Sequence, residues 1–226
     1  MSGKYTIPKT RSVNRVAFTE EYVKGKDILH VGVGGAITDL DLKDKFLKTN
    51  VSNWFHSKIS KTAKSIATLE LEQDNIDKFK EIIPGDYILG DITDPGVLEN
   101  FGEKKYELIV FTEIIEHIDC FRTALQNMRS LLKPGGQILI STVNAYNIFS
   151  FVKLLFRYES NHIEHTSYFS YLTIKQLLWM NQLQIDEFYF AHDYPKKFLT
   201  RMVKYFFYRL TPQYSQGILV LASNAD

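Results

Sequence analysis

Short apolar runs alternate with stretches of helical spacing between residues 27 and 143. The runs read DILHVGVG, IATLELE, YILGD, YELIVF and QILISTV along the chain. Strands of a parallel sheet are buried on both faces and read as continuous apolar runs, and their alternation with helices is typical of βαβ units. The pattern predicts an α/β fold with a mainly parallel sheet, helices on both faces and right-handed crossovers.

The clearest predicted helix follows the fourth apolar run. Its apolar positions, spaced three or four residues apart, are Ile118, Phe121, Leu125, Met128 and Leu132. The sequence Lys133-Pro-Gly-Gly then stops the helix, because proline cannot continue it and glycine allows a left-handed turn back into the sheet. We also expect a helical extension over residues 1–25, a helix from Leu172, and strands from Ile185 and Gly217.

The composition is that of an ordinary globular protein. With 226 residues, 45% hydrophobic and 23% charged, the chain is expected to form one domain over residues 1–226. A net charge of +1 argues against binding to duplex nucleic acid. The single cysteine, Cys120, cannot form an internal disulfide, and no apolar run approaches the roughly 18 residues that span a bilayer. The cytoplasm is therefore the expected location.

The first predicted strand runs into a glycine-rich turn, where a doubly wound sheet binds its ligand. Gly32 and Gly34 would let the backbone approach that ligand closely. The dinucleotide pattern Gly-x-Gly-x-x-Gly needs a third glycine where this chain has Ile37. A nicotinamide cofactor, and with it an oxidoreductase, is therefore disfavoured.

Two carboxylates end the next two predicted strands. Glu70 follows Gly34 by 36 positions, so an insert of about residues 39–61 separates the first two strands, and Asp91 ends the third. Single carboxylates at strand ends are often merely solvated. Here the glycines, Glu70 and Asp91 all fall at the carboxyl edge of one sheet, which is where open α/β sheets bind ligands. Together they predict an adenosine site, with Glu70 on the ribose and Asp91 on the adenine amino group.

Two longer motifs complete the pattern. Residues 106–117 read YELIVFTEIIEH, and residues 131–141 read LLKPGGQILIS. With these motifs the chain resembles the class I S-adenosylmethionine-dependent methyltransferases over roughly residues 26–190. The resemblance implies that family's Rossmann-like fold, with a seven-stranded, mainly parallel sheet closed by an antiparallel last strand.

The resemblance also implies a set of residues that bind the cofactor S-adenosylmethionine. Gly32 and Gly34 would approach its methionine part, and Thr112 would line the floor of the site. The remaining expected cofactor contacts are Glu70, Leu71, Asp91 and Ile92. The first motif departs from the family, which usually has an acidic residue at the position of His30 and a glycine at the position of Ala36.

A closer resemblance is to a subgroup of bacterial surface-glycan and lipopolysaccharide methyltransferases. Its signature matches residues 53–56, NWFH, and residues 165–170, HTSYFS. This likeness implies O-methylation of a small polar, sugar or glycan-type acceptor in polysaccharide biosynthesis. Two alternatives stay open: a quinone or RNA-end O-methyltransferase that uses a divalent metal, and a regulatory module that binds the cofactor without catalysis.

Three histidines are the candidate catalytic residues. Methyl transfer requires the acceptor atom to be held opposite the leaving sulfur, and a hydroxyl acceptor must also lose its proton. A neutral histidine is the usual side chain for that work. His117 follows the fourth strand, where we expect it to begin a helix, and His162 and His165 lie in a segment that can fold over the same crevice. The three side chains are expected to converge.

The segment around His117 could instead hold a metal ion. Glu113, Glu116 and His117 would share one helical face at spacings of three and four, and a later histidine could complete a set for Mg²⁺, Mn²⁺ or Zn²⁺. Small-RNA terminal 2′-O-methyltransferases carry a similar element. Because carboxylate and histidine faces of helices are more often structural, the sequence does not favour a metal.

Two segments after the fifth strand carry apolar and basic residues. Residues 145–158, AYNIFSFVKLLFRY, predict a helix in an acceptor-side lid over residues 145–183. Residues 196–210 combine five cations with five aromatic residues and no acid. This composition fits three interpretations. The favoured one is a helix packed on the sheet with its cations extended to solvent, because charged faces on core helices are common. The others are a helix on the inner membrane surface and a site for a phosphorylated acceptor.

Overall fold

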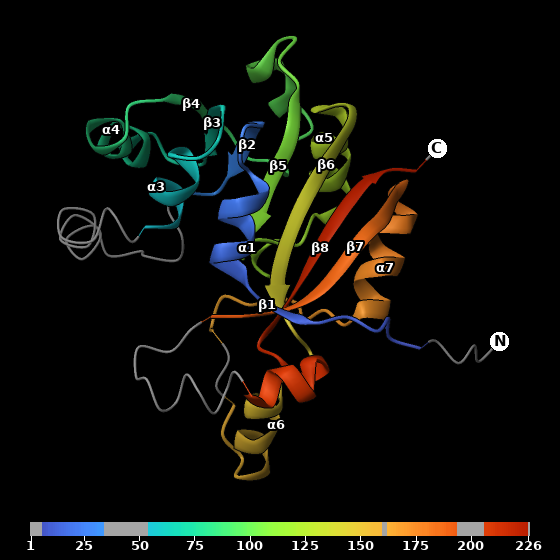
Figure 1. Cartoon of the computed structure of the whole chain (residues 1–226). Coiled ribbons are helices and arrows are strands. Elements are labelled where there is room, and N and C mark those ends of the chain that lie inside the picture. Colours follow the sequence, from blue (N-terminus) through green and yellow to red (C-terminus); the bar gives the residue numbers. More distant parts are fainter. Residues whose placement is uncertain (1–5, 34–53, 160–161, 194–205, 226) are drawn as a thin grey trace. The chain divides into compact units, whose positions relative to one another are not determined.

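A computed structural model describes residues 6–33, 54–159, 162–193 and 206–225 (Figure 1). The chain forms two compact units. The first unit comprises Met1–Phe18, Thr112–Asp119 and Leu139–Asp226, and the second comprises Thr19–Phe111 and Cys120–Ile138. Helix α1 (Arg15–Tyr22) and the strands β5 (Tyr106–Thr112) and β6 (Leu132–Val143) contribute residues to both. The interpretation of the whole chain as one domain stays a prediction.

The second unit contains the parallel part of the sheet, with strand order β6-β5-β2-β3-β4. Besides its part of β6, its strands are β2 (Asp27–Val31), β3 (Ser65–Glu70), β4 (Asp86–Leu89) and all of β5 except Thr112. Its helices are α3 (Phe55–Ser60), α4 (Gln73–Ile82), the 3-10 helix η2 (Val97–Phe101) and α5 (Phe121–Ser130). Strand β2 pairs in parallel with β3 and β5, and β3 with β4, so the carboxyl ends of these strands share one edge.

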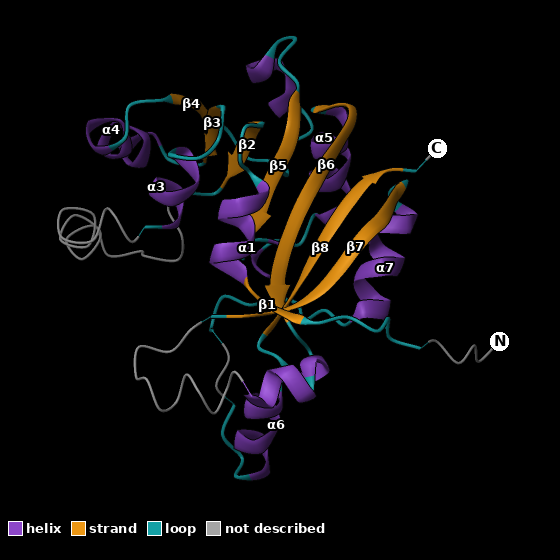
Figure 2. Ribbon diagram, viewed as in Figure 1, coloured by secondary structure: helices purple, strands orange, loops and turns teal. Residues whose placement is uncertain are grey.

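The first unit contains the antiparallel pair of β7 and β8, within the strand order β1-β7-β8-β6 (Figure 2). Its strands besides β6 are β1 (Ser12–Asn14), β7 (Leu183–His192) and β8 (Gly217–Asn224). Its helical elements are η3 (Ile115–His117), α6 (Ile148–Leu155), α7 (Tyr171–Met180), residues 206–210 and η4 (Pro212–Tyr214). Strand β7 is antiparallel to β8, which confirms the predicted antiparallel last strand.

The described residues form eight strands, one more than the seven implied by the family resemblance. The additional strand, β1, pairs in parallel with β7, with Ser12 opposite Phe190. Only Val13 of its three residues is buried, so β1 has no apolar run of its own and forms because β7 is there to pair with it. The helical extension expected over residues 1–25 is therefore wrong in part, since β1 precedes α1. The mixed α/β fold is confirmed.

Apolar runs formed the buried strands β2 and β5, and the helix predicted after β5 formed with shifted ends. In β2 and β5, Ile28, Leu29 and Leu108 are fully buried, as expected for strands covered on both faces. Helix α5 buries Ala124 and Leu125 but runs only from Phe121 to Ser130. Ile118 and Leu132, the outermost residues of the predicted helix, are instead placed in the preceding loop and at the start of β6. None of the described helices is long and apolar enough to cross a membrane.

Two glycines lie near the start of β6, where the sequence predicted a turn that stops the helix: α5 already ends at Ser130 and the strand begins at Leu132. Gly135 has a φ of +74°, which favours glycine, whereas Gly136 is restricted by space. A Cβ on Gly136 would lie 2.9 Å from the backbone oxygens of Lys133 and Tyr106. The two positions therefore require glycine for different reasons.

Gly136→Ala should lower the free energy of unfolding by about 1–3 kcal/mol, because the added methyl group must push backbone atoms apart. Gly85→Ala is the matched control, since its Cβ would meet no atom closer than 3.5 Å and its φ is not positive. Urea titration measures both. Equal stability of the two variants would contradict the close approach.

Candidate functional site

The three predicted histidines converge in the first unit. Their ligand-type ring nitrogens, one from each of His117, His162 and His165, all lie within 4.8 Å of one another. The ring centroid of His117 is 4.7 Å from that of His165 and 5.8 Å from that of His162, and the centroids of His162 and His165 are 5.4 Å apart. The expected convergence is confirmed, although 45 residues separate His117 from His162 in the sequence.

Thr166 joins the two segments that carry these histidines. Its backbone N–H donates to the carbonyl of Glu116 at 2.8 Å, and its hydroxyl donates to the carbonyls of Glu116 and Ile118, each at 3.1 Å. The N–H of His165 donates to the carbonyl of His162 at 3.1 Å, which closes the downstream segment into a turn. The histidine cluster is therefore held by main-chain hydrogen bonds and does not depend on contacts between the rings alone.

The predicted helical face of Glu113, Glu116 and His117 is wrong. Helix α5 starts only at Phe121, and the segment before it is the 3-10 helix η3, which follows Glu113 at a φ of +56°. The carboxylate of Glu113 accepts from the Ser141 hydroxyl at 2.9 Å and pairs with Arg15 at 3.2 Å. A left-handed residue interrupts any helix there, so the carboxylates do not follow the spacing that the sequence suggested.

Glu116 is buried beneath this segment, with none of its surface exposed. One carboxylate oxygen accepts from the Thr142 hydroxyl at 2.9 Å. Burial, with the nearby charge of Glu113, raises the pKa of Glu116 to about 7. Burial, with the charges of His117 and His162, lowers the pKa of His165 below its usual value. The neutral form of the His165 imidazole is therefore favoured.

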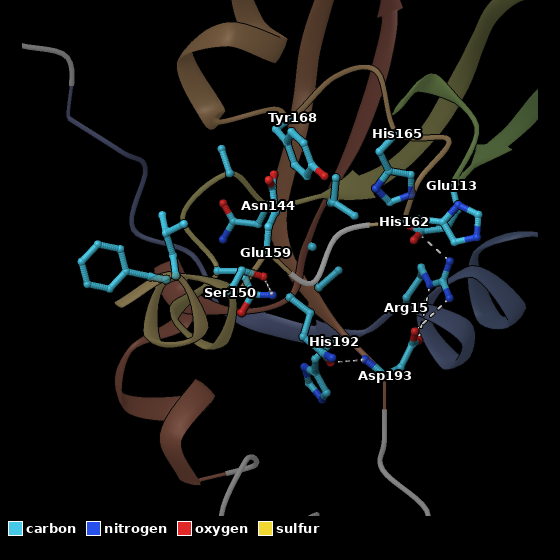
Figure 3. A pocket seen from close by; sticks show the side chains of 18 residues that line it. Arg15, Glu113, Asn144, Ser150, Glu159, His162, His165, Tyr168, His192 and Asp193 are labelled. Carbon is cyan, nitrogen blue, oxygen red and sulfur yellow. Dashed lines mark hydrogen bonds and ion pairs between the residues drawn. The ribbon is translucent and has the colours of Figure 1, made fainter. Parts of the chain in front are cut away.

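A pocket of about 560 Å³ in the first unit has His162 and His165 in its wall (Figure 3). Several of its other polar side chains were not predicted from the sequence: Arg15, Asn144, Glu159, Tyr168, His192 and Asp193. Arg15 pairs with Asp193 at 2.9 Å across 178 residues of sequence. No local pattern could show such a pair. The pocket wall contains hydrogen-bond donors and acceptors as well as positively and negatively charged side chains, which suits a polar ligand.

The glycine turn lies in the second unit, at the end of β2. Gly32 has a φ of +70°, and its N–H donates to the carbonyl of Leu69 at 3.0 Å. The next N–H, that of Val33, donates to the carboxylate of Glu70 at 3.1 Å. The turn after β2 and the acidic end of β3 are thus directly bonded. Gly34, Ala36 and Ile37 lie outside the described residues, as does most of the predicted insert.

Glu70 is 5% exposed and is held in place by the start of α4. Its carboxylate also accepts from the side-chain amide of Asn75 at 3.2 Å and from the N–H of Leu71, which is itself exposed. A carboxylate fixed by neutral donors needs little reorganisation to accept hydrogen bonds from a ligand hydroxyl.

The loop after β4 contains the predicted adenine residues. Asp91 is exposed and accepts from the N–H of Thr93 at 2.8 Å, which closes a small turn. Ile92 is buried, and its carbonyl accepts from the side-chain amide of Asn127 in α5 at 2.9 Å. The same amide donates to the carbonyl of Asp94 at 2.8 Å. Asn127, which no sequence motif indicated, therefore fixes this loop.

His30 replaces the expected acidic residue, and its partner is His56. The two Nδ1 atoms are 2.9 Å apart, the rings are stacked, and both side chains are almost fully buried. Burial lowers the pKa of His56 to about 4, and burial together with His56 lowers that of His30 well below its usual value. Trp54 packs on His56 with ring centroids 5.1 Å apart. Residues 54–56 thus support the glycine strand from inside the second unit.

The remaining predicted site elements lie in the first unit. Thr112 is the last residue of β5 and is buried, and its role at the cofactor floor stays a prediction. The lid segment contains a helix, α6, that is shorter than expected and buries none of its residues. Of the basic aromatic segment, residues 194–205 lie outside the described residues, and residues 206–210 are helical with Tyr208 buried.

The fold is shared with methyltransferases of known structure. Solved structures that resemble the chain include an S-adenosylmethionine-dependent methyltransferase from Archaeoglobus fulgidus, 14% identical with a TM-score of 0.58, covering 92% of this chain and 90% of that chain. The N-methyltransferase NodS from Bradyrhizobium japonicum, solved with S-adenosylhomocysteine, is 14% identical with a TM-score of 0.52, covering 94% and 85%. A putative methyltransferase complex with the Trm112 activator from Haloferax volcanii matches at 14% identity and a TM-score of 0.61, covering 93% and 88%.

A family model described as a methyltransferase domain matches residues 11–187. The chain belongs to this family. No curated protein matches the chain.

Proposed function

We propose that the chain is an S-adenosylmethionine-dependent methyltransferase that methylates an oxygen of a polar acceptor. The observation that carries the cofactor assignment is the bond between Val33 in the glycine turn and Glu70 at the end of β3. This bond joins the glycine turn, whose backbone a ligand can approach closely, to a fixed carboxylate at the edge where open α/β sheets bind ligands. Family membership and the structure of NodS with S-adenosylhomocysteine support the same cofactor.

Several residues of the second unit fit the parts of this cofactor. Gly32 has no side chain to block a methionine group, Glu70 offers acceptors for two ribose hydroxyls, and the loop of Asp91 and Ile92 offers a polar and an apolar wall for adenine. The bound cofactor supplies a methyl group on a positively charged sulfur. We expect no acidic side chain from β2 at the methionine amine, because His30 faces His56 instead.

The first unit offers the groups for the acceptor. The pocket beside the histidine cluster contains Arg15, Asn144 and Glu159, which can bind hydroxyl and carboxylate groups. A sugar or glycan carries several hydroxyls and would use this mixture of donors and acceptors, so we favour a glycan-type acceptor in polysaccharide biosynthesis. As a hydroxyl oxygen gains the methyl carbon, the carbon–sulfur bond breaks and the hydroxyl proton leaves. We propose His117, His162 and His165 as the catalytic residues that assist the loss of this proton.

Isothermal titration with S-adenosylmethionine and with S-adenosylhomocysteine tests the cofactor. One binding event per chain is the expected result, and no heat with either compound would overturn the proposed function.

Screening mono- and oligosaccharides for S-adenosylhomocysteine release then tests the acceptor class. Binding without release from any sugar, quinone or RNA acceptor would favour a cofactor-binding module without catalysis.

His165→Ala should slow methyl transfer on the order of 100-fold while changing cofactor affinity by no more than a few fold. The imidazole assists the loss of the proton from the acceptor hydroxyl, so its removal should lower mainly kcat. Lys175→Ala, at an exposed position of α7, is the control and should keep the wild-type rate. A His165→Ala enzyme with the wild-type kcat would remove this histidine from the catalytic set.

A further inference from the structure

The histidine cluster contains more imidazoles than proton transfer needs. One neutral imidazole suffices to accept a proton, yet three ring nitrogens from two distant segments lie within 4.8 Å of one another. Three convergent imidazoles are also the protein ligand set of a catalytic zinc site, in which a fourth position stays open for a ligand. The convergence of three imidazoles therefore favours a metal site over a single general base.

We propose that His117, His162 and His165 form a binding site for a divalent cation of the zinc type. In a tetrahedral site with metal–nitrogen distances of about 2.1 Å, the ligand nitrogens lie roughly 3.4 Å apart. The observed limit of 4.8 Å requires only a small closure. His117 and His162 are partly exposed, with 25% and 44% of their side-chain surface accessible, so their rings can turn into place.

Two further observations favour a cation in this cluster. The Nδ1 atom of His165 is buried and has no hydrogen-bond partner among the described residues, although a buried polar atom is normally bonded. One carboxylate oxygen of Glu164 lies 3.9 Å from Nδ1 of His117 and 3.8 Å from Nδ1 of His162. A carboxylate beside the imidazoles adds negative charge, either as a further ligand or as the partner that orients them.

The proposed ligands differ from the set that the sequence suggested. Glu113 is bonded to Ser141 and paired with Arg15, and Glu116 is buried against Thr142. The site therefore consists mainly of imidazoles and would select zinc-type cations over Mg²⁺, which prefers oxygen ligands.

The role of the cation rests on the proposed function. His162 and His165 also line the pocket, so a cation there would contact an acceptor hydroxyl and lower its pKa. The hydroxyl proton could then leave to water, and the three imidazoles would act on the acceptor through the cation. Cation binding itself does not require an acceptor or S-adenosylmethionine, so it can be tested separately.

The test is titration of the untagged full chain with ZnCl₂ after chelator treatment, together with the absorption spectrum of the Co²⁺ form. We expect one equivalent of Zn²⁺ to bind and Co²⁺ to give the intense visible bands of a tetrahedral site. His162→Ala and His165→Ala should each weaken Zn²⁺ binding by about 100-fold or more, and Glu164→Gln by about 10-fold. His192→Gln, a histidine outside the cluster, should keep one equivalent.

The outcomes separate this inference from the proposed function. No Zn²⁺ binding by the wild-type chain, or undiminished binding by the His162→Ala/His165→Ala double variant with unchanged circular dichroism, would overturn the cation site. S-adenosylmethionine binding in the same sample would still support a methyltransferase. His162 is exposed, so its replacement does not threaten folding and keeps the test decisive.

Discussion

Glu70→Ala is expected to weaken S-adenosylmethionine binding by on the order of 200-fold. The carboxylate ends β3 beside the glycine turn and would accept hydrogen bonds from two ribose hydroxyls. Hydrogen bonds to a charged group contribute about 1.5–3 kcal/mol each, and losing both should cost about 3 kcal/mol after water replaces part of them. Isothermal titration of the variant against S-adenosylmethionine and S-adenosylhomocysteine measures the change, which should be similar for both.

Two further variants separate binding from support of the turn. Glu70→Gln keeps an acceptor for the Val33 N–H but removes the charge, so it should bind the cofactor with intermediate affinity. Glu72→Gln changes an exposed carboxylate two residues away, which bonds only to Asn75 in the described structure, and should leave affinity within about two-fold. An unchanged dissociation constant in the Glu70→Ala variant would place the ribose elsewhere.

The sequence was sufficient for the parts of the fold that are buried along a continuous stretch. Strands β2 and β5 were predictable because nearly every side chain in them is buried, which leaves a visible apolar run. Strand β1 was not, because its three residues become a strand only by pairing with β7, about 178 residues later. The start of α5 was misplaced for a similar reason: the apolar residue Ile118 lies in a loop, and spacing alone cannot separate a loop from a helix there.

The candidate site shows the same division. The position of Glu70 followed from strand ends meeting at one sheet edge, and the histidine convergence followed from a segment after β6 that can reach η3. The pairing of Arg15 with Asp193 could not be predicted, since it depends on β1 lying beside β7. The left-handed conformation of Glu113 also escaped prediction, because glutamate carries no signal for it.

The pair of His30 and His56 should make the stability of the chain depend on pH. A 2.9 Å contact between two Nδ1 atoms requires one ring to donate and the other to accept, so a second proton breaks it. Burial lowers the pKa of folded His56 to about 4, while the unfolded chain has the ordinary value of about 6.5. Between these values the unfolded state binds more protons, so this stabilisation is complete above about pH 6.5 and is lost as the pH falls towards 4.

Comparison with His56→Gln isolates this contribution. Between pH 7.5 and pH 4.5 the free energy of unfolding should fall by about 2.5 kcal/mol more in the wild type than in the variant, because only the wild type must keep His56 neutral. Buried Glu116, whose pKa is raised to about 7, acts in the opposite direction, but it is present in both proteins and cancels in the difference. Urea titrations at the two pH values provide the measurement. Parallel losses in both proteins would show that His56 takes up a proton in the folded state as readily as in water, which its burial beside Trp54 and Tyr87 argues against.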